Sequence, residues 1–324
     1  MWIILLWIFL FVVGYFIIFF AADVFLENLK GLCIIYNVSP FIIGLLVLGI
    51  DPEESIASII AAINNLPYIA VGNVIGNSII ALTIPFALPV FFYRVKYKPV
   101  AQYYFNLIYI SMICIFTGLL FYFGLFFAGF FCIIIYILYL IKNTRNFSAK
   151  DLIVSPTGGE SKDIQLTIEK NKNEKKSRKF ILVLIGFIFI FLGGELLIIS
   201  AANIIILTSI PETFFGFVII ALVTNVEEIT LVLKSIKKQS VDIAFGGMIG
   251  KLIWNLTLTF GISGIIIKNF QFTWIFFWNW VILLILIIYF NYISRKKIFE
   301  RNEGLILMLI FVCFITINFL VISI

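Results

Sequence analysis

Long apolar stretches separated by short polar segments predict ten membrane-spanning helices in this chain of 324 residues. The first, at 2–20, is too long for the core of a signal peptide and has no basic segment before it, so we expect it to be retained as a span. A short polar connection is predicted to follow at 23–30. The predicted spans are 2–20, 39–64, 67–92, 103–122, 124–141, 180–207, 212–236, 241–267, 272–293 and 304–323.

A polar segment at 142–179, rich in Lys, Asn, Ser and Glu, divides the chain into two halves of five spans each. Its composition is typical of a flexible linker. The halves are 1–141 and 180–324, and each contains one copy of a repeat, at about 39–92 and about 212–267. Because five is an odd number, the two halves enter the membrane from opposite sides. The predicted fold class is an all-α membrane protein, with ten transmembrane helices arranged as two inverted five-helix repeats.

Composition supports the membrane assignment and removes several function classes. Hydrophobic residues make up 63% of the chain and charged residues 12%, with a mean hydropathy of +1.16. Soluble proteins are typically about 45–50% apolar and about 25% charged. The chain has no histidine, which excludes histidine proton relays, histidine metal ligands and nucleophiles activated by histidine. Its four cysteines show no C-x-x-C spacing and are interpreted as packing residues.

The basic residues predict an orientation, because cytoplasmic loops collect Lys and Arg. If the amino terminus is outside, every one of the 23 basic residues except Lys251 and Lys268 falls on the inside. The linker at 142–179 is then cytoplasmic, and the membrane is expected to be the cell (plasma) membrane. The net charge of +6 therefore reflects membrane topology, and no nucleic-acid partner is expected.

Two stretches, 44–82 and 216–256, share one pattern at an offset of 174 residues. The offset aligns Glu54 with Glu228 and Glu53 with Glu227, and no gap is needed. It also aligns the glycine pairs Gly72 with Gly246 and Gly76 with Gly250. A carboxylate inside an apolar span is costly unless it serves an ion or a polar cavity. The paired carboxylates therefore indicate a transport site, and the glycine spacing favours close helix packing.

Three charged residues are predicted to lie near the middle of the membrane. At a rise of about 1.5 Å per residue, Glu54, Glu228 and Lys251 lie roughly 12–15 Å inside a core about 30 Å thick. At that depth we expect Lys251 to pair with a carboxylate in a cavity lined by protein. Glu195, in the sixth span, has no counterpart in the first half and is interpreted as a polar contact at a helix end.

These residues resemble the motifs of the Ca²⁺/cation antiporter superfamily, which includes the sodium/calcium exchangers. The first repeat reads GIDPEE at 49–54 and GNVIGNSIIA at 72–81, and the second reads VTNVEE at 223–228 and GGMIGKLIWN at 246–255. Members of that superfamily carry two inverted repeats of this kind in a ten-span fold. The resemblance implies that Glu54 and Glu228 are the two ion-binding glutamates, and therefore the expected metal ligands.

The resemblance also implies further ligands and some departures. Asn255 matches a ligand of the second repeat, whereas Ala81 stands at the matching position of the first, and Ile50 stands where Ser or Thr is usual. Lys251 replaces a serine that helps to bind Na⁺ in the family, and we expect it to compensate charge. The candidate cation-binding residues are Glu54, Glu228, Asp51, Thr224, Asn225, Asn255 and Asn77; Glu53, Glu227 and Asn73 are expected to lie beside them.

The chemistry of these residues favours cation exchange. Carboxylate and amide oxygens are hard ligands that suit Ca²⁺ and related cations. The acidic residues of both repeats cannot all be ionised beside one lysine, so some are expected to hold protons and release them on cation binding. We therefore expect a secondary active antiporter that exchanges Ca²⁺ or a related cation for H⁺ or Na⁺ by alternating access. Its expected partners are inorganic cations and the lipid bilayer, and no cofactor is expected.

Alternatives stay open at this point. A cation channel could use the same polar residues, although matched glutamates in inverted repeats favour alternating access. A non-transporting divergent homologue is the other alternative, because Ala81 and Ile50 offer no ligand oxygen. An enzyme is not expected, since Asp51 has no second membrane-embedded aspartate. Lys251 is expected to substitute for one coupling ion, or else to form a salt bridge that only holds the repeats together. The oligomeric state is left open.

The predicted orientation can be tested by labelling. A single cysteine placed between Ser161 and Asn173, in a variant whose four native cysteines are replaced, should react with an impermeant maleimide only from the cytoplasmic side. Labelling from the outside of intact cells would contradict the orientation, and the cysteine-free parent supplies the background.

Overall fold

The computed structural model describes residues 2–35, 51–90, 95–96, 100–121, 123–146, 176–225, 228–229, 232, 241–296 and 298–320. The first half contains α1 (Trp2–Ile35), α3 (Pro52–Ile63), α4 (Pro67–Val90), β1 (Val95–Lys96), α5 (Gln102–Leu120) and α6 (Gly124–Asn146). The second contains α8 (Lys176–Thr208), α9 (Glu212–Phe214), η1 (Phe215–Ile220), α10 (Ala221–Thr224), α12 (Val241–Trp254), η2 (Asn255–Thr259), α13 (Phe260–Ile266), α14 (Trp274–Lys296), β2 (Ile298–Phe299) and α15 (Arg301–Leu320). The segments η1 and η2 are π-helical.

Eight of the described helices are long and apolar enough to cross a membrane, and Glu212–Thr224 forms a shorter apolar helix. The chain is therefore an integral membrane protein. The helices follow the predicted spans closely: 67–92 corresponds to α4, 103–122 to α5 and 272–293 to α14. The predicted spans 39–64 and 212–236 lie partly outside the described residues. The helices α6 and α8 extend a few residues into the predicted linker, and 147–175 is not described.

The polar connection predicted at 23–30 is wrong, because α1 continues through it to Ile35. This stretch contains no glycine or proline that would end a helix. Asp23 and Glu27 are exposed, one helical turn apart, while Asn28 is buried and donates a hydrogen bond from Nδ2 to the Val24 carbonyl at 2.7 Å. These polar residues therefore do not end the helix.

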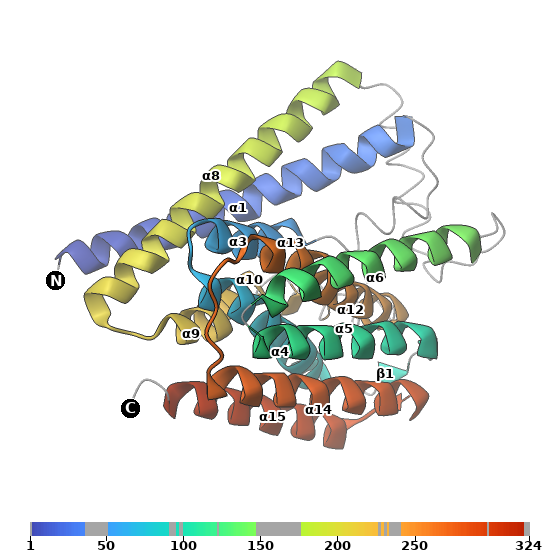
Figure 1. Ribbon diagram of the computed structural model, residues 1–324. Coiled ribbons are helices and arrows are strands. Elements are labelled where there is room, and N and C mark those ends of the chain that lie inside the picture. Colours follow the sequence, from blue (N-terminus) through green and yellow to red (C-terminus); the bar gives the residue numbers. More distant parts are fainter. Residues whose placement is uncertain are drawn as a thin grey trace.

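The helices pack as a bundle around α4. In Figure 1, α5, α6, α14 and α15 run nearly parallel to one another, and α1 and α8 form a long pair along one side of them. The helix α4 contacts α3, η1 and α10 as well as α14 and α15, and it is buried along most of its length. It therefore joins elements from both halves of the chain.

The connections at one end of the bundle also pair. The strand β1, which follows α4, forms an antiparallel ribbon with β2, between α14 and α15, with Val95 opposite Phe299 and Lys96 opposite Ile298. Both loops carry basic residues that were predicted to lie inside. The start of α1 and the end of α15 lie at the other end of the bundle (Figure 1).

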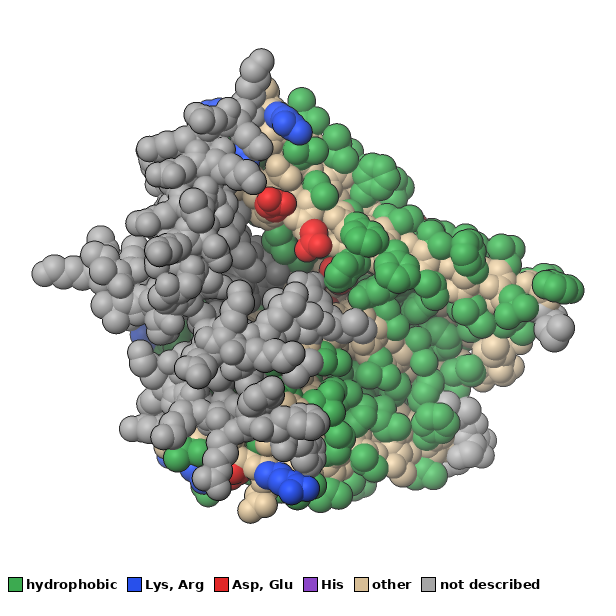
Figure 2. Space-filling model, turned by 180° about the vertical axis from the view of Figure 1, so that it is seen from behind, with side chains coloured by type: hydrophobic (Ala, Val, Ile, Leu, Met, Phe, Trp, Pro, Cys, Tyr) green, Lys and Arg blue, Asp and Glu red, His purple; other side chains and the backbone are tan. Residues whose placement is uncertain are grey.

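The outer faces of the long helices carry apolar side chains. Large exposed hydrophobic residues include Phe9, Phe127, Phe130 and Phe187, together with many leucines and isoleucines. Figure 2 shows hydrophobic side chains dominating the right-hand part of one face of the molecule. A surface of this kind would promote aggregation in water and is suited to lipid.

Small residues allow the two repeats to approach closely at α4. A Cβ atom added to Gly76 would lie 2.1 Å from the Phe217 carbonyl oxygen, and one added to Gly216 would lie 2.7 Å from the Tyr68 carbonyl oxygen. Both neighbours are backbone atoms, which cannot move without shifting η1 or α4. Gly246 has nothing within 4 Å of such an atom, so the close packing predicted for the glycine pairs does not extend to it.

This contrast gives a stability test. Gly76→Ala should destabilise the protein by about 1–3 kcal/mol, because overpacking forces the backbone apart. Gly246→Ala serves as the matched control and should be neutral or slightly stabilising, since alanine favours a helix. Thermal unfolding of both variants in detergent would measure the difference. Equal melting temperatures would contradict the packing described here.

Candidate cation-binding site

The site begins at the amino end of α3, whose local sequence fixes two acidic side chains. Asp51 is the N-cap residue, and its Oδ1 accepts a hydrogen bond from the Glu54 backbone N–H at 3.2 Å. Pro52 follows in the first turn, where its missing N–H costs nothing. The Ser55 hydroxyl donates to the Asp51 carbonyl at 2.8 Å. The carboxylates of Asp51 and Glu54 therefore face one region at a helix amino terminus.

A third carboxylate joins them from the second repeat. Oxygen atoms of Asp51, Glu54 and Glu228 all lie within 4.8 Å of one another, a spacing that could hold one metal ion. The Lys251 ammonium lies among them, 3.0 Å from Asp51 Oδ2 and 2.5 Å from Glu54 Oε1, and it donates a hydrogen bond to Glu228 Oε1. The structure thus brings the repeat carboxylates together, and Lys251 pairs with three of them.

Side-chain amides extend this cluster across the two repeats. Asn255 donates from Nδ2 to Glu54 Oε2 at 2.6 Å and lies 3.3 Å from Asn77 Oδ1. Asn77 in turn donates to the Thr224 hydroxyl at 3.0 Å, and Asn225 donates from Nδ2 to the Asn77 carbonyl at 3.4 Å. All seven residues predicted to bind a cation therefore lie in one connected region, and Lys251 lies within it.

The cluster is buried, and its most open member is Asp51. Glu54 is 1% exposed, and Glu228 and Lys251 are each 7% exposed, whereas the Asp51 side chain is 15% exposed. Among the described residues, the buried oxygens Glu228 Oε2 and Asn225 Oδ1 have no hydrogen-bond partner. Buried acceptors without partners are costly. Hard oxygen donors of this kind fit a cation such as Ca²⁺.

The residues expected beside the ligands are only partly described. Asn73 donates to the Glu54 carbonyl at 3.2 Å and to the Ser58 hydroxyl at 2.8 Å, so it supports the backbone of the site. Glu53 is buried in the first turn of α3. Ala81 is buried and offers no side-chain oxygen. Glu227 and Ile50 lie outside the described residues.

Sequence reasoning missed a small hydroxyl network that joins the site to η2. The Ser55 and Thr259 hydroxyls are 2.7 Å apart, and Trp254 donates from Nε1 to Ser55 Oγ at 2.7 Å. The Thr259 hydroxyl lies 3.5 Å from Asn255 Oδ1. A signal was present in the spacing, since Thr259 follows Asn255 by four residues and Ser55 follows Glu54 directly. The π-helical turn that begins at Asn255 had no such signal.

Two other glutamates support helix ends away from the cluster. Glu195 accepts hydrogen bonds from the Asn64 side chain at 3.2 and 3.3 Å, at the carboxyl end of α3. Glu212 accepts from the Tyr68 and Ile69 backbone N–H groups at 2.9 and 3.1 Å, at the amino end of α4. The interpretation of Glu195 as a polar contact at a helix end agrees with this geometry.

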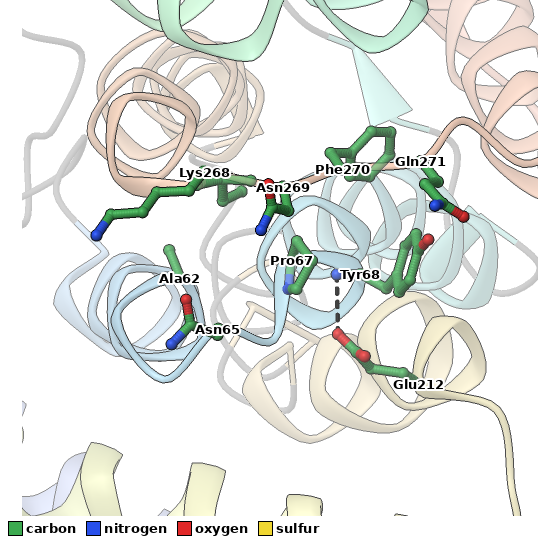
Figure 3. A pocket seen from close by; sticks show the side chains of 10 residues that line it. Ala62, Asn65, Pro67, Tyr68, Glu212, Lys268, Asn269, Phe270 and Gln271 are labelled. Atoms are coloured by element: carbon green, nitrogen blue, oxygen red, sulfur yellow. Dashed lines mark hydrogen bonds between the residues drawn. The ribbon is translucent and has the colours of Figure 1, made fainter. Parts of the chain in front are cut away.

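Glu212 also lines a cavity of about 540 Å³ between the α3–α4 and α13–α14 connections. In Figure 3 the Glu212 carboxylate turns to the Tyr68 backbone, while the Lys268 amino group points away from it. The cavity contains none of the residues of the carboxylate cluster. Its charged groups do not converge, so the cluster is the stronger candidate for an ion site.

Comparison with known proteins is consistent across most of the chain. The model of the family described as sodium/calcium exchanger protein matches residues 6–145 and 178–320. An uncharacterized membrane protein of Methanocaldococcus jannaschii is 25% identical over 252 residues, which cover 75% of this chain and 76% of that protein.

Solved structures of two exchangers share the fold. The H⁺/Ca²⁺ exchanger CAX aligns with a TM-score of 0.72 and 14% identity, covering 98% of this chain and 85% of that one. The sodium-calcium exchanger NCX_Mj, soaked with Na⁺ and Ca²⁺, aligns with a TM-score of 0.57 and 20% identity, covering 96% of this chain and 98% of that one. The predicted all-helical, inverted-repeat fold is therefore confirmed.

Proposed function

We propose, because this chain belongs to the sodium/calcium exchanger protein family, that it is a secondary active antiporter which exchanges Ca²⁺ or a related cation for H⁺ or Na⁺ by alternating access. The observation that carries the proposal is the convergence of Asp51, Glu54 and Glu228 from both repeats on one buried site. Glu54 and Glu228 are the proposed metal ligands, and Asp51, Asn77, Thr224, Asn225 and Asn255 complete the proposed cation site.

The ligand set supports a divalent cation. Three carboxylates supply strong negative charge, and Glu228 Oε2 and Asn225 Oδ1, which have no hydrogen-bond partner among the described residues, can add further contacts. Calcium takes six to eight oxygen ligands with flexible geometry, a number that carboxylate, amide and hydroxyl oxygens of this cluster can approach. Magnesium demands a stricter octahedron and keeps its waters, which suits this crowded site less well.

The same burial supports exchange between ions. Carboxylates that are desolvated together must be neutralised, because an uncompensated buried charge is strongly unfavourable. If one ion leaves, another ion or a proton has to take its place before the site can become open to the other face of the membrane. The names of the two exchangers that share the fold mention Na⁺ with Ca²⁺ and H⁺ with Ca²⁺. Na⁺ and H⁺ are therefore both candidates for the counter-ion.

The site geometry favours alternating access over a channel. A channel needs a continuous polar path, whereas Glu54 and Asn77 are almost completely buried and contact groups of the opposite repeat. We place the moving parts in the two halves, 1–141 and 180–324, joined by a cytoplasmic linker at 142–179. The proposed membrane is the cell membrane with the amino terminus outside.

The test is a pair of neutral substitutions. Glu54→Gln and Glu228→Gln should each reduce counter-ion-dependent ⁴⁵Ca²⁺ uptake into proteoliposomes to background, because each removes a ligand charge while keeping the side-chain shape. Glu195→Gln, which changes a glutamate outside the cluster, is the matched control and should retain uptake. Thermal unfolding of all three variants would show that they fold.

Other results would identify the rival functions. Uptake that persists in both Glu54→Gln and Glu228→Gln would contradict the site. Wild-type Ca²⁺ flux that needs no counter-ion and shows no saturation would indicate a channel. A folded wild-type protein that neither binds nor moves Ca²⁺ would indicate a non-transporting homologue.

A further inference from the structure

The position of Lys251 distinguishes it from an ordinary salt-bridge partner. Its ammonium contacts one oxygen of Asp51, one of Glu54 and one of Glu228, and these are the three carboxylates of the proposed cation site. It donates a hydrogen bond to Glu228 Oε1 and forms ion pairs with Asp51 Oδ2 at 3.0 Å and Glu54 Oε1 at 2.5 Å. The residue lies where a small cation would find the same oxygens.

We propose that the Lys251 ammonium is a built-in cation that takes the place of one monovalent coupling ion, so that exchange by this chain does not require Na⁺. The inference rests on the function proposed above and adds the charge balance of the site. The proposed role of Lys251 differs from a purely structural one, because a salt bridge between the repeats would need only one carboxylate. Here both acidic residues of the first repeat and one of the second share the same nitrogen.

The charges at the site fix how many cations it can bind. Three ionised carboxylates carry three negative charges, and Lys251 reduces the sum to two, which one divalent cation neutralises. Removing the ammonium changes this balance by one unit when the protonation of the carboxylates stays the same. A site without Lys251 therefore needs one additional monovalent cation for every divalent cation that it carries. That cation would come from solution.

A tethered cation also differs from a dissolved one in what it contributes to coupling. Lys251 is attached to α12, so it moves with the site and is never released on either side of the membrane. It can neutralise part of the carboxylate charge while no divalent cation is bound, without dissipating a gradient. The desolvation cost of the carboxylates is then offset in part by the protein itself.

The geometry also predicts competition at the site. Lys251 occupies oxygens of Asp51, Glu54 and Glu228 that a Ca²⁺ ion would use, so Ca²⁺ binding requires the ammonium to withdraw from some of them. Na⁺, with a single charge, gains less from the same oxygens and cannot displace a group of equal charge so readily. Na⁺ should consequently bind the wild-type site weakly.

The experiment compares four forms in proteoliposomes: wild type, Lys251→Ser, Lys251→Met and Lys251→Arg. ⁴⁵Ca²⁺ uptake is measured against internal Ca²⁺ without Na⁺, against an imposed Na⁺ gradient and against an imposed pH gradient. Wild type should take up Ca²⁺ without Na⁺ and respond little to Na⁺, and the uptake that Lys251→Arg retains should likewise not require Na⁺, because the positive charge is kept. Lys251→Ser and Lys251→Met should lose Na⁺-free exchange and regain it with Na⁺, a change of at least about tenfold for one uncompensated buried charge.

The outcomes separate this inference from the proposed function. Wild-type exchange that depends strongly on Na⁺, with the same dependence in Lys251→Ser, would overturn the role of Lys251 and leave the antiporter proposal intact. Absence of Ca²⁺/Ca²⁺ exchange in folded wild type would overturn both.

A binding measurement decides the question if the neutral variants fail to fold. The thermal stability of the wild type is followed in Na⁺, with K⁺ as the ionic-strength control. The inference expects little Na⁺-specific stabilisation and clear stabilisation by Ca²⁺. A Na⁺-specific increase in thermal stability that becomes smaller as Ca²⁺ is added would contradict the proposed role of Lys251.

Discussion

Lys251 allows three carboxylates to lie within 4.8 Å of one another inside an integral membrane protein. Without a positive charge among them, their mutual repulsion and their desolvation would oppose folding of both repeats around the same point. Much of the surrounding structure serves to hold this contact in place. Asp51 caps α3, Asn255 fixes one oxygen of Glu54, and close packing between α4 and η1 brings the two repeats together.

The two repeats contribute to the site in different ways, although their sequences align at a constant offset. The first repeat supplies Asp51 and Glu54 from a regular helix that begins with an N-cap and a proline. The second supplies Glu228, Lys251 and Asn255, and two π-helical turns interrupt its helices. Asn77 and Lys251 occupy equivalent positions, as do Ala81 and Asn255. A net acidic half therefore meets a half that carries both a carboxylate and the balancing ammonium.

Hydrophobic runs were sufficient to predict most helices, because a membrane span must satisfy its own backbone hydrogen bonds and present apolar side chains to lipid. The same reasoning predicted that Lys251 would pair with a carboxylate, since mid-span charges have few other partners. It could not predict that three carboxylates would share the ammonium, which depends on how the amino end of α3 lies relative to the Lys251 side chain of α12. It also failed where a helix continues through polar residues, as in α1 from Asp23 to Ile35. The contacts of Ser55, Trp254 and Thr259 also depend on a π-helical turn, which the spacing of hydrophobic residues does not predict.

The location of the site at the boundary between the repeats limits how the protein can move. Glu54 lies in α3 and Asn77 in α4, while Thr224, Lys251 and Asn255 come from the second repeat. At the same boundary, Gly76 places α4 against the η1 backbone with no room for a methyl group. Elements packed this closely are held at a fixed separation and resist being pulled apart locally. In the proposed exchange, the two halves would therefore have to move while α4 and η1 stay in contact, and such a movement would alter the set of oxygens around a bound ion. In the proposed mechanism, binding and movement would be coupled, because candidate ligands such as Asn77 lie directly beside the glycine contact at the boundary between the repeats.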